Sequence, residues 1–177
     1  TDLNLILNRN FNNISNDINF EHNEELETIK SFEHNCIFLI NGKVISTKFD
    51  HEEKNKISIK DYDEKNTTNL VLSNSLTLLN NALSSGGFLL EVNENYKLKK
   101  PLVVYNYFSK DLKNKILNNR NSIKLNNGSE LTLIEYTYDI SKTNFIKNTI
   151  DTVSLGENAI LKNVFIQNSK SNGHFYK

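Results

Sequence analysis

Three short segments with one shared pattern decide the fold of this chain: Val92-Asn93-Glu94-Asn95-Tyr96-Lys97-Leu98, Leu125-Asn126-Asn127-Gly128-Ser129-Glu130-Leu131 and Leu155-Gly156-Glu157-Asn158-Ala159-Ile160-Leu161. Each begins with an aliphatic residue, has Asn or Gly three positions later, and ends with Leu after three more. Asn and Gly are the residues that most readily adopt a left-handed backbone conformation. Each segment therefore predicts a strand, a tight turn and a second strand.

The three segments recur at a nearly constant spacing, 33 and then 30 residues. A repeat of this length is typical of a solenoid, in which each coil buries its apolar side chains by stacking on its neighbours. The pattern weakens two residues beyond the final leucines, where Lys100, Leu133 and Asn163 stand. A β-sandwich built from hairpins is the alternative.

Composition limits the functions open to the 177 residues. Lys plus Arg and Asp plus Glu both number 21, so the formal net charge is zero, which argues against a nucleic-acid or anionic-membrane surface. No apolar run approaches the roughly 18 residues of a spanning helix. With a single cysteine, Cys36, the chain suits a reducing compartment, and we expect a soluble protein of the cytoplasm or of a plastid-type organelle. The lack of any Met, even at position 1, leads us to expect a fragment of a longer protein.

Upstream of the repeats, two local signals are clear. Asn41-Gly42 separates two β-prone runs over residues 36–46, which predicts a hairpin with a type I′ turn. The leucines at 72, 76, 79 and 83 have the spacing of one helical face. We expect Ser73 or Asn74 to cap this helix and Gly86-Gly87 to end it.

Weaker signals complete the N-terminal half. Residues 1–20 have no clear periodicity and predict an irregular arm. Good helix formers with early acidic residues predict a short helix over 23–31. Residues 58–60 predict a short strand, and the charged stretch 47–56 predicts an exposed loop.

Side chains capable of catalysis are sparse. The four histidines, His22, His34, His51 and His174, are scattered in polar surroundings, and we interpret them as exposed or hydrogen-bonded. His34 and Cys36 are two residues apart, but a metal site needs three or four ligands. Cys36 is better interpreted as a small buried hydrophobic residue. We therefore expect no catalytic, cofactor-binding or metal-ligating residue in this chain.

Aromatic residues alternate with polar ones in the later strands. They could form a stacking platform for a ligand, but no basic residues are interleaved with them, so packing along a sheet face is the favoured interpretation. The residues concerned are Tyr105, Tyr107, Phe108, Tyr136 and Tyr138.

The order of several segments resembles the SufB/SufD family of iron–sulfur cluster assembly proteins. The similarity spans about residues 36–167, and the Asn-Gly hairpin and the Leu-Ile-Glu stretch are closer to the SufD branch. The segments that carry it are Phe38–Val44, Leu76–Leu83, Gly87–Val92, Leu98–Leu102, Leu131–Tyr136 and Val153–Ala159.

This resemblance implies a mainly β fold, a right-handed parallel β-helix preceded by a small α/β region. Residues 1–85 would hold the arm, short helix, hairpin and leucine-rich helix, and residues 86–177 the first coils. The implied function is a non-catalytic scaffold subunit that pairs with a SufB-like paralogue and a SufC-type ABC ATPase. Iron or an iron–sulfur cluster would be handled by the full complex, because the family's implicated cysteine and histidine lie beyond the matched region.

Two other functions stay open. A carbohydrate-active β-helix enzyme would need clustered carboxylates. Glu130 and Glu135 are expected on adjacent strand positions, but Glu91 and Glu157 belong to turns, so the pattern forces no pair together. A structural β-solenoid that binds another protein is the third hypothesis. An open last coil would expose unpaired backbone, so we expect association through that edge.

Overall fold

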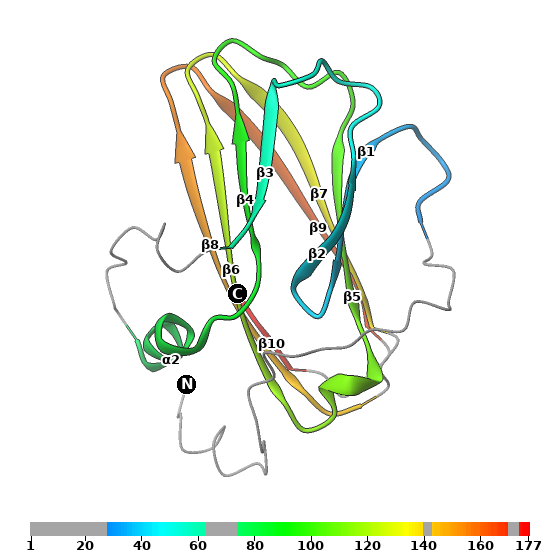
Figure 1. The fold of residues 1–177 in the computed structure, drawn as a ribbon, viewed down its shortest axis with the longest axis vertical. Helices are drawn as coiled ribbons and strands as arrows, with labels where there is room; N and C mark the ends of the chain where they lie inside the picture. Colours follow the sequence, from blue (N-terminus) through cyan, green and yellow to red (C-terminus); the bar gives the residue numbers. More distant parts are fainter. Residues whose placement is uncertain (1–27, 63–73, 140–142, 170–173) are drawn as a thin grey trace.

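A computed structural model describes residues 28–62, 74–139, 143–169 and 174–177. Strands make up more than half of these residues and form two five-stranded sheets that face each other, so the expected mainly β class is confirmed (Figure 1). The first sheet has the order β2-β1-β5-β7-β9 and the second β10-β8-β6-β4-β3. The strands are β1 (Asn35–Ile40), β2 (Lys43–Lys48), β3 (Ile57–Asp61), β4 (Phe88–Val92), β5 (Leu102–Phe108), β6 (Ile116–Leu125), β7 (Glu130–Asp139), β8 (Ile146–Leu155), β9 (Ile160–Ser169) and β10 (His174–Tyr176).

From β4 onward the chain alternates between the two sheets, strand by strand. β4 pairs with β6, β5 with β7, β6 with β8 and β7 with β9, always in parallel. In these pairs each residue lies beside one that is 30–33 positions further along the chain. β2 and β3 are antiparallel additions at one edge of each sheet.

The three repeated segments form stacked turns, as the sequence predicts. Asn95, Gly128 and Asn158 have φ values of +56°, +65° and +56°, all in the left-handed region. The turns hydrogen-bond to one another through their backbones, from Asn95 N to Asn127 O at 2.7 Å and from Gly128 N to Glu157 O at 2.8 Å. The repeat therefore marks equivalent positions in successive layers.

The predicted hairpin is also confirmed. β1 and β2 are antiparallel and joined by Asn41 and Gly42, whose φ values of +48° and +81° fit a type I′ turn. The short strand expected at 58–60 is β3. Residues 28–31 are not helical, so the expected helix over 23–31 is wrong in that part. Its remainder and the arm at 1–20 lie outside the described residues.

The leucine-rich helix exists as α2 (Ser75–Leu83), and the Asn74 side chain caps it by accepting a hydrogen bond from Thr77 N. It ends earlier than expected, with Ser84 as the C-cap. Gly87 has a different role: its φ is +123°, and a Cβ there would lie 1.8 Å from Arg120 O. The glycine is required because the start of β4 passes close to β6.

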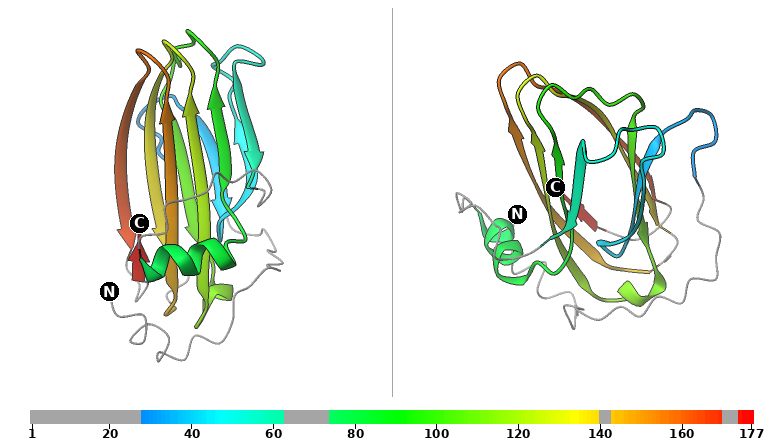
Figure 2. Two further views of the ribbon diagram at one scale, coloured as in Figure 1. Left: turned by 90° about the vertical axis from the view of Figure 1, so that its left-hand side faces the viewer. Right: turned by 45° about the horizontal axis from the view of Figure 1, so that its top comes forward.

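α2 lies across the outer face of the second sheet near one end of its strands (Figure 2). The one buried residue of this helix is Asn80, and the leucines at 76, 79 and 83 are only partly buried. Asn80 Nδ2 donates to Asn119 O at 3.0 Å and to Asn148 O at 2.8 Å. The helix therefore docks through hydrogen bonds at its centre as well as through its apolar face.

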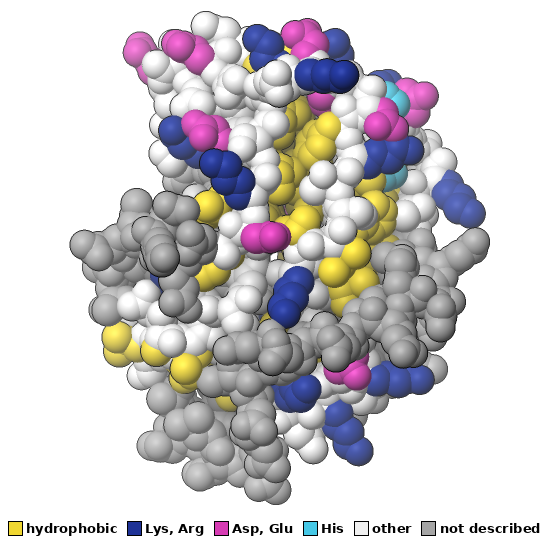
Figure 3. Space-filling view, viewed as in Figure 1, with side chains coloured by type: hydrophobic (Ala, Val, Ile, Leu, Met, Phe, Trp, Pro, Cys, Tyr) yellow, Lys and Arg dark blue, Asp and Glu magenta, His cyan; other side chains and the backbone are white. Residues whose placement is uncertain are grey.

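The space between the sheets holds two apolar clusters separated by polar residues. The larger cluster lies toward the stacked turns, and Figure 3 shows hydrophobic side chains between the sheets on the face that carries β2 and β3. The smaller cluster lies near η2 (Lys110–Leu112), a short 3-10 helix. The larger cluster is centred on Ile37, Leu39, Leu90, Val92, Leu102, Val104, Ile123, Leu125, Leu131 and Leu133, and the smaller consists of Phe108, Leu112, Leu117 and Phe145.

The expected boundary between residues 85 and 86 stays a prediction. Strands on both sides of it belong to the same two sheets, because β1 pairs with β5 and β3 pairs with β4. No helix among the described residues is both long and apolar enough to cross a membrane.

Candidate functional site

A group of polar and charged side chains, four of them buried, one half-buried and one exposed, lies between the two apolar clusters, mostly on the inner faces of β7 and β8. Residues alternate between the two faces of a strand. On β7, Leu131 and Leu133 belong to the larger apolar cluster, so positions 135 and 137 also face inward. On β8, positions 153 and 155 pair with Ile123 and Leu125 of that cluster, so positions 147, 149 and 151 face inward as well. We call this set the polar section. It consists of Glu135 and Thr137 on β7, Lys147, Thr149 and Asp151 on β8, and Lys177 after β10.

One ammonium group joins the two carboxylates of the polar section. Lys177 Nζ lies 2.5 Å from Glu135 Oε2 and 2.7 Å from Asp151 Oδ2. The other oxygens of the carboxylates accept hydrogen bonds from Asn163 Nδ2, at 2.9 Å, and Asn121 Nδ2, at 2.8 Å. Burial acts to lower the pKa of Lys177, but Asp151 and Glu135 raise it above the ordinary value. This ammonium group therefore offsets one of the two negative charges, and the hydrogen bonds hold both carboxylates in place.

Lys147 is the second cation of the polar section, and it is nearly buried, with 7% of the residue exposed. Burial lowers its pKa to about 8, against the opposing attraction of Asp151 and Glu135. Its Nζ lies 5.3 Å from the ring centroid of Phe108, a cation–π contact. It belongs to none of the ion pairs within 4.0 Å in the described ranges. A buried amine with a perturbed pKa beside two carboxylates is a common mark of a functional site, although ion-pair networks with a structural role also produce it.

This cluster was not predicted from the sequence, although the sequence contains a signal for it. Glu135 and Asp151 are equidistant from residue 143, in the connection between β7 and β8, and so are Thr137 and Thr149. Two strands that run in opposite directions on facing sheets bring such positions opposite each other. The residue types alternate as in an ordinary half-exposed strand, which hides the fact that the polar side faces inward.

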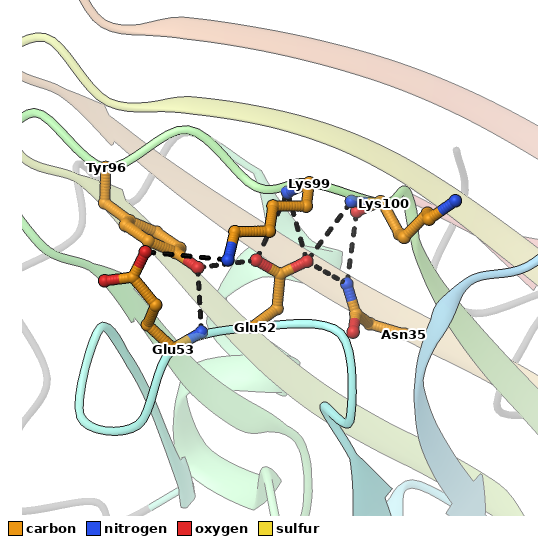
Figure 4. Close-up of polar contacts among 6 residues, drawn as sticks. All are labelled: Asn35, Glu52, Glu53, Tyr96, Lys99 and Lys100. Atoms are coloured by element: carbon orange, nitrogen blue, oxygen red, sulfur yellow. Dashed lines mark hydrogen bonds and ion pairs between the residues drawn. The ribbon is translucent and has the colours of Figure 1, made fainter.

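A second polar cluster surrounds Glu52, in the connection between β2 and β3 (Figure 4). Asn35 Nδ2 donates to Glu52 Oε1 at 2.7 Å, and the Tyr96 hydroxyl donates to Oε2 at 2.7 Å. The backbone N–H groups of Lys99 and Lys100 donate to the same carboxylate at 3.1–3.2 Å. The expected exposed loop at 47–56 is therefore tied to the start of β1 and to the segment before β5.

The environment of Glu52 favours its charged form. Burial raises the pKa of the carboxyl, but the hydrogen bonds from Tyr96, Asn35 and the two backbone amides together lower it below its ordinary value. The Tyr96 hydroxyl also accepts a hydrogen bond from Glu53 N at 3.0 Å. Because protein groups already occupy the oxygens of Glu52, we interpret this cluster as a structural tie.

His34 and Cys36 do not come together as a metal site. The Nδ1 of His34 is 2.9 Å from Phe32 O, and its Nε2 is 2.8 Å from the Tyr105 hydroxyl, so the imidazole is hydrogen-bonded, as expected. Cys36 is buried in the sheet, and burial raises the pKa of its thiol. No group of three or more His, Cys, Asp and Glu residues in the described part of the chain is arranged to hold a metal ion.

The tyrosines pack on the outer face of the first sheet, as expected. Tyr105 and Tyr107 stack with an interplanar angle of 16°, Tyr136 and Tyr138 with 11°, and the two pairs meet edge to face. Tyr105 and Tyr107 are fully buried. Phe108 differs from the group, because it faces the interior and packs against the residues of the smaller apolar cluster.

The carboxylates considered for a carbohydrate-active site lie apart. Glu130 and Glu135 are five residues apart on β7, so they project to opposite faces. Glu130 forms an ion pair with Lys97, and Glu91 forms one with Lys124 at 2.8 Å. The carboxylates that do approach each other are Glu135 and Asp151, on the inner faces of the sheets.

Comparisons with known proteins add no relative: no family model matches the chain, and no curated protein matches it.

Proposed function

We propose that this chain is the early β-helix portion of a SufD-like scaffold subunit, a member of the SufB/SufD family without catalysis of its own. Its complex would carry iron or an iron–sulfur cluster as cargo. The observation that carries the proposal is the alternation of strands between two sheets with a parallel register of 30–33 residues. Four of the six segments that resemble the family lie in this part of the chain, and the other two precede it.

The pairing supports the finer assignment of a right-handed parallel β-helix. In such a fold one coil contains a strand from each sheet, and each coil pairs with the next along its full length. The stacked turns at Asn95, Gly128 and Asn158 support it, because they would be equivalent points of three successive coils. Connections between parallel strands are overwhelmingly right-handed in proteins, which supports the proposed handedness.

The proposed role as a scaffold also needs a surface for partners. Large exposed hydrophobic side chains gather on β8 and β9, and β9 is the edge strand of the first sheet. An edge strand offers unpaired backbone groups, and apolar side chains beside it offer contact area. On β9 the residues are Ile160, Val164, Phe165 and Ile166. On β8 they are Val153 and Leu155, which face the interior but are about half exposed, since β10 pairs only with residues 146–148 of that strand.

Co-purification tests the proposal. The full-length protein, carrying an affinity tag, is co-expressed with the SufB-like protein and the SufC-type ATPase encoded in the same genome. We expect a complex that contains all three and survives size-exclusion chromatography. If the SufB-like protein and the ATPase purify together while the tagged protein stays alone, the proposed function is wrong.

A further inference from the structure

The centre of the polar section contains two threonines whose hydroxyls have no hydrogen-bond partner among the described residues. Thr137 and Thr149 are 0% and 4% exposed, and the Oγ1 atom of each makes no hydrogen bond within the described structure. Beside Thr149 in the second sheet, the Oδ1 atom of Asn119 is also buried without a partner. Buried polar groups in native proteins nearly always find a partner, so these atoms point to a bound molecule.

Contacts on both sides place the two threonines opposite each other. On one side, Glu135 and Asp151 hold the same Lys177 ammonium across the interior. On the other side, Lys147 reaches the ring of Phe108, and Phe108 pairs with residue 139 of β7. Thr137 and Thr149 are the inward-facing positions between these two cross-sheet contacts, one on each sheet.

Lys147 adds a strong donor to the same place. It lies on the same face of β8 as Thr149, two residues away, and its buried ammonium contacts an aromatic ring rather than a carboxylate. An ammonium group has three donors, and leaving them without acceptors in a buried place is strongly unfavourable. A molecule held by the two threonines would also supply an acceptor to this ammonium.

The charges of the polar section indicate what kind of molecule fits. Two ammonium groups, on Lys147 and Lys177, balance two carboxylates, on Glu135 and Asp151. An anion would give the polar section a net negative charge, and a cation would face the buried Lys147 ammonium. A neutral molecule that both donates and accepts hydrogen bonds leaves the balance intact.

We propose that Thr137 and Thr149 form an internal hydration site, in which bound water bridges the two hydroxyls and solvates the Lys147 ammonium. Bound water of this kind makes two to four hydrogen bonds to groups that would otherwise be unsatisfied. Contact with this water allows the buried Lys147 ammonium to exchange its proton with water inside the fold. This role is independent of the partners proposed above.

Replacement by valine, which has the shape of threonine without the hydroxyl, gives opposite results for a hydrated and a dry site. If water bonds the hydroxyls, Thr137→Val and Thr149→Val each lower the equilibrium constant for folding about five- to tenfold. If the hydroxyls have no partner, both variants are as stable as the wild type or more stable, which overturns the proposal. Thr132→Val, on the outer half-buried face of β7, is the matched control and should change stability little. Urea unfolding of the full chain measures all of them.

Titration of Lys147 provides a second readout that a purely structural role would not change. The ¹³Cε resonance of Lys147, assigned by its loss in Lys147→Met, is followed with pH by NMR. We expect a lower pKa in Thr137→Val and Thr149→Val than in the wild type, because the solvating water is lost; an unchanged pKa contradicts the proposal. Melting temperature is also measured against sodium chloride and sodium phosphate. A rise with either salt that Thr149→Val abolishes would show an anion in place of water.

Discussion

Replacement of Glu52 by Gln is the sharpest test of how the loop between β2 and β3 is held. Gln keeps the shape of the side chain but places an NH2 group where donors now point. At least one of the hydrogen bonds from Asn35, Tyr96 and the Lys99 or Lys100 amide is then lost. A hydrogen bond to a charged group contributes about 1.5–3 kcal/mol, and partial access of water reduces the loss, so we expect the free energy of unfolding to fall by about 2 kcal/mol.

Urea unfolding followed by far-UV circular dichroism measures the effect, with Glu53→Gln as the matched control. Glu53 is the neighbouring residue, and its carboxylate lies 3.6 Å from Lys99 Nζ in an exposed pair. Exposed pairs of this kind contribute about 0–1 kcal/mol. The control variant should therefore unfold at nearly the wild-type urea concentration.

The pH dependence of stability tests whether the charged form of Glu52 holds the loop. The pKa of Glu52 is lowered in the folded protein, so the unfolded chain binds the proton more tightly. The stabilisation is then complete above the unfolded pKa of about 4.3 and is lost as the pH falls through the lower folded pKa. The difference between wild type and Glu52→Gln should be full near pH 7 and should shrink at acidic pH. Equal stability of Glu52→Gln and Glu53→Gln, or a difference that does not change with pH, would refute the reasoning.

Three further predictions follow from single contacts. Lys147→Met should stabilise the protein by about 3 kcal/mol near pH 7. The pKa of Lys147 is lower in the folded protein than in the unfolded chain, so this gain should vanish as the pH rises from about 8 to 10.5. Urea unfolding across that pH range checks it, and a gain that is independent of pH would exclude Lys147 as the titrating group. Asn158→Ala should destabilise by about 1 kcal/mol, whereas Asn158→Gly should be nearly neutral, since φ is +56° there; thermal melts of both variants compare them, and equal melts would contradict the turn assignment. Asn80→Ala should lower the free energy of unfolding by about 3 kcal/mol, since it leaves Arg120 Nε and the carbonyls of residues 119 and 148 without the Asn80 side chain as a partner. Asn81→Ala, on the exposed side of the helix, should lower it by less than about 1 kcal/mol. Denaturant curves that coincide for the two variants would exclude Asn80 as the docking point of α2.

The turns were predictable from the sequence because backbone conformation restricts the residue type directly. A left-handed position accepts Asn and Gly with little strain, and Asn41-Gly42, Asn95, Gly128 and Asn158 all occupy such positions. A signal of this kind is local and survives a biased composition. The same reasoning predicted Ser73 or Asn74 as the start of α2, and Asn74 is the cap. It misplaced the end of the helix, because Gly87 is required by its close approach to β6 and not by the helix.

The polar section was not predictable in the same way, because it depends on which face of β7 and β8 turns inward. The leucines at 131 and 133 set that face, and Glu135 and Thr137 then follow on it. The sequence of β7 alone is compatible with either of its faces being turned inward. Only the pairing of two sheets decides that a carboxylate faces the interior, and that Asp151 stands across from it.

Asparagine connects these observations, since the 31 residues of this type in the chain do more than reflect composition. Some occupy left-handed turns, and others are buried away from the turns and satisfy backbone or side-chain groups, as Asn148 does with Leu76 O and with Asn118 Oδ1. These bonds gather at the end of the sheets where α2 lies, opposite the stacked turns and their apolar core. Hydrophobic burial is non-directional, whereas a hydrogen bond requires one alignment of its partners. The apolar core therefore stabilises the stacked strands without requiring one register, whereas the hydrogen bonds of the asparagines require particular residues of neighbouring strands to lie beside each other.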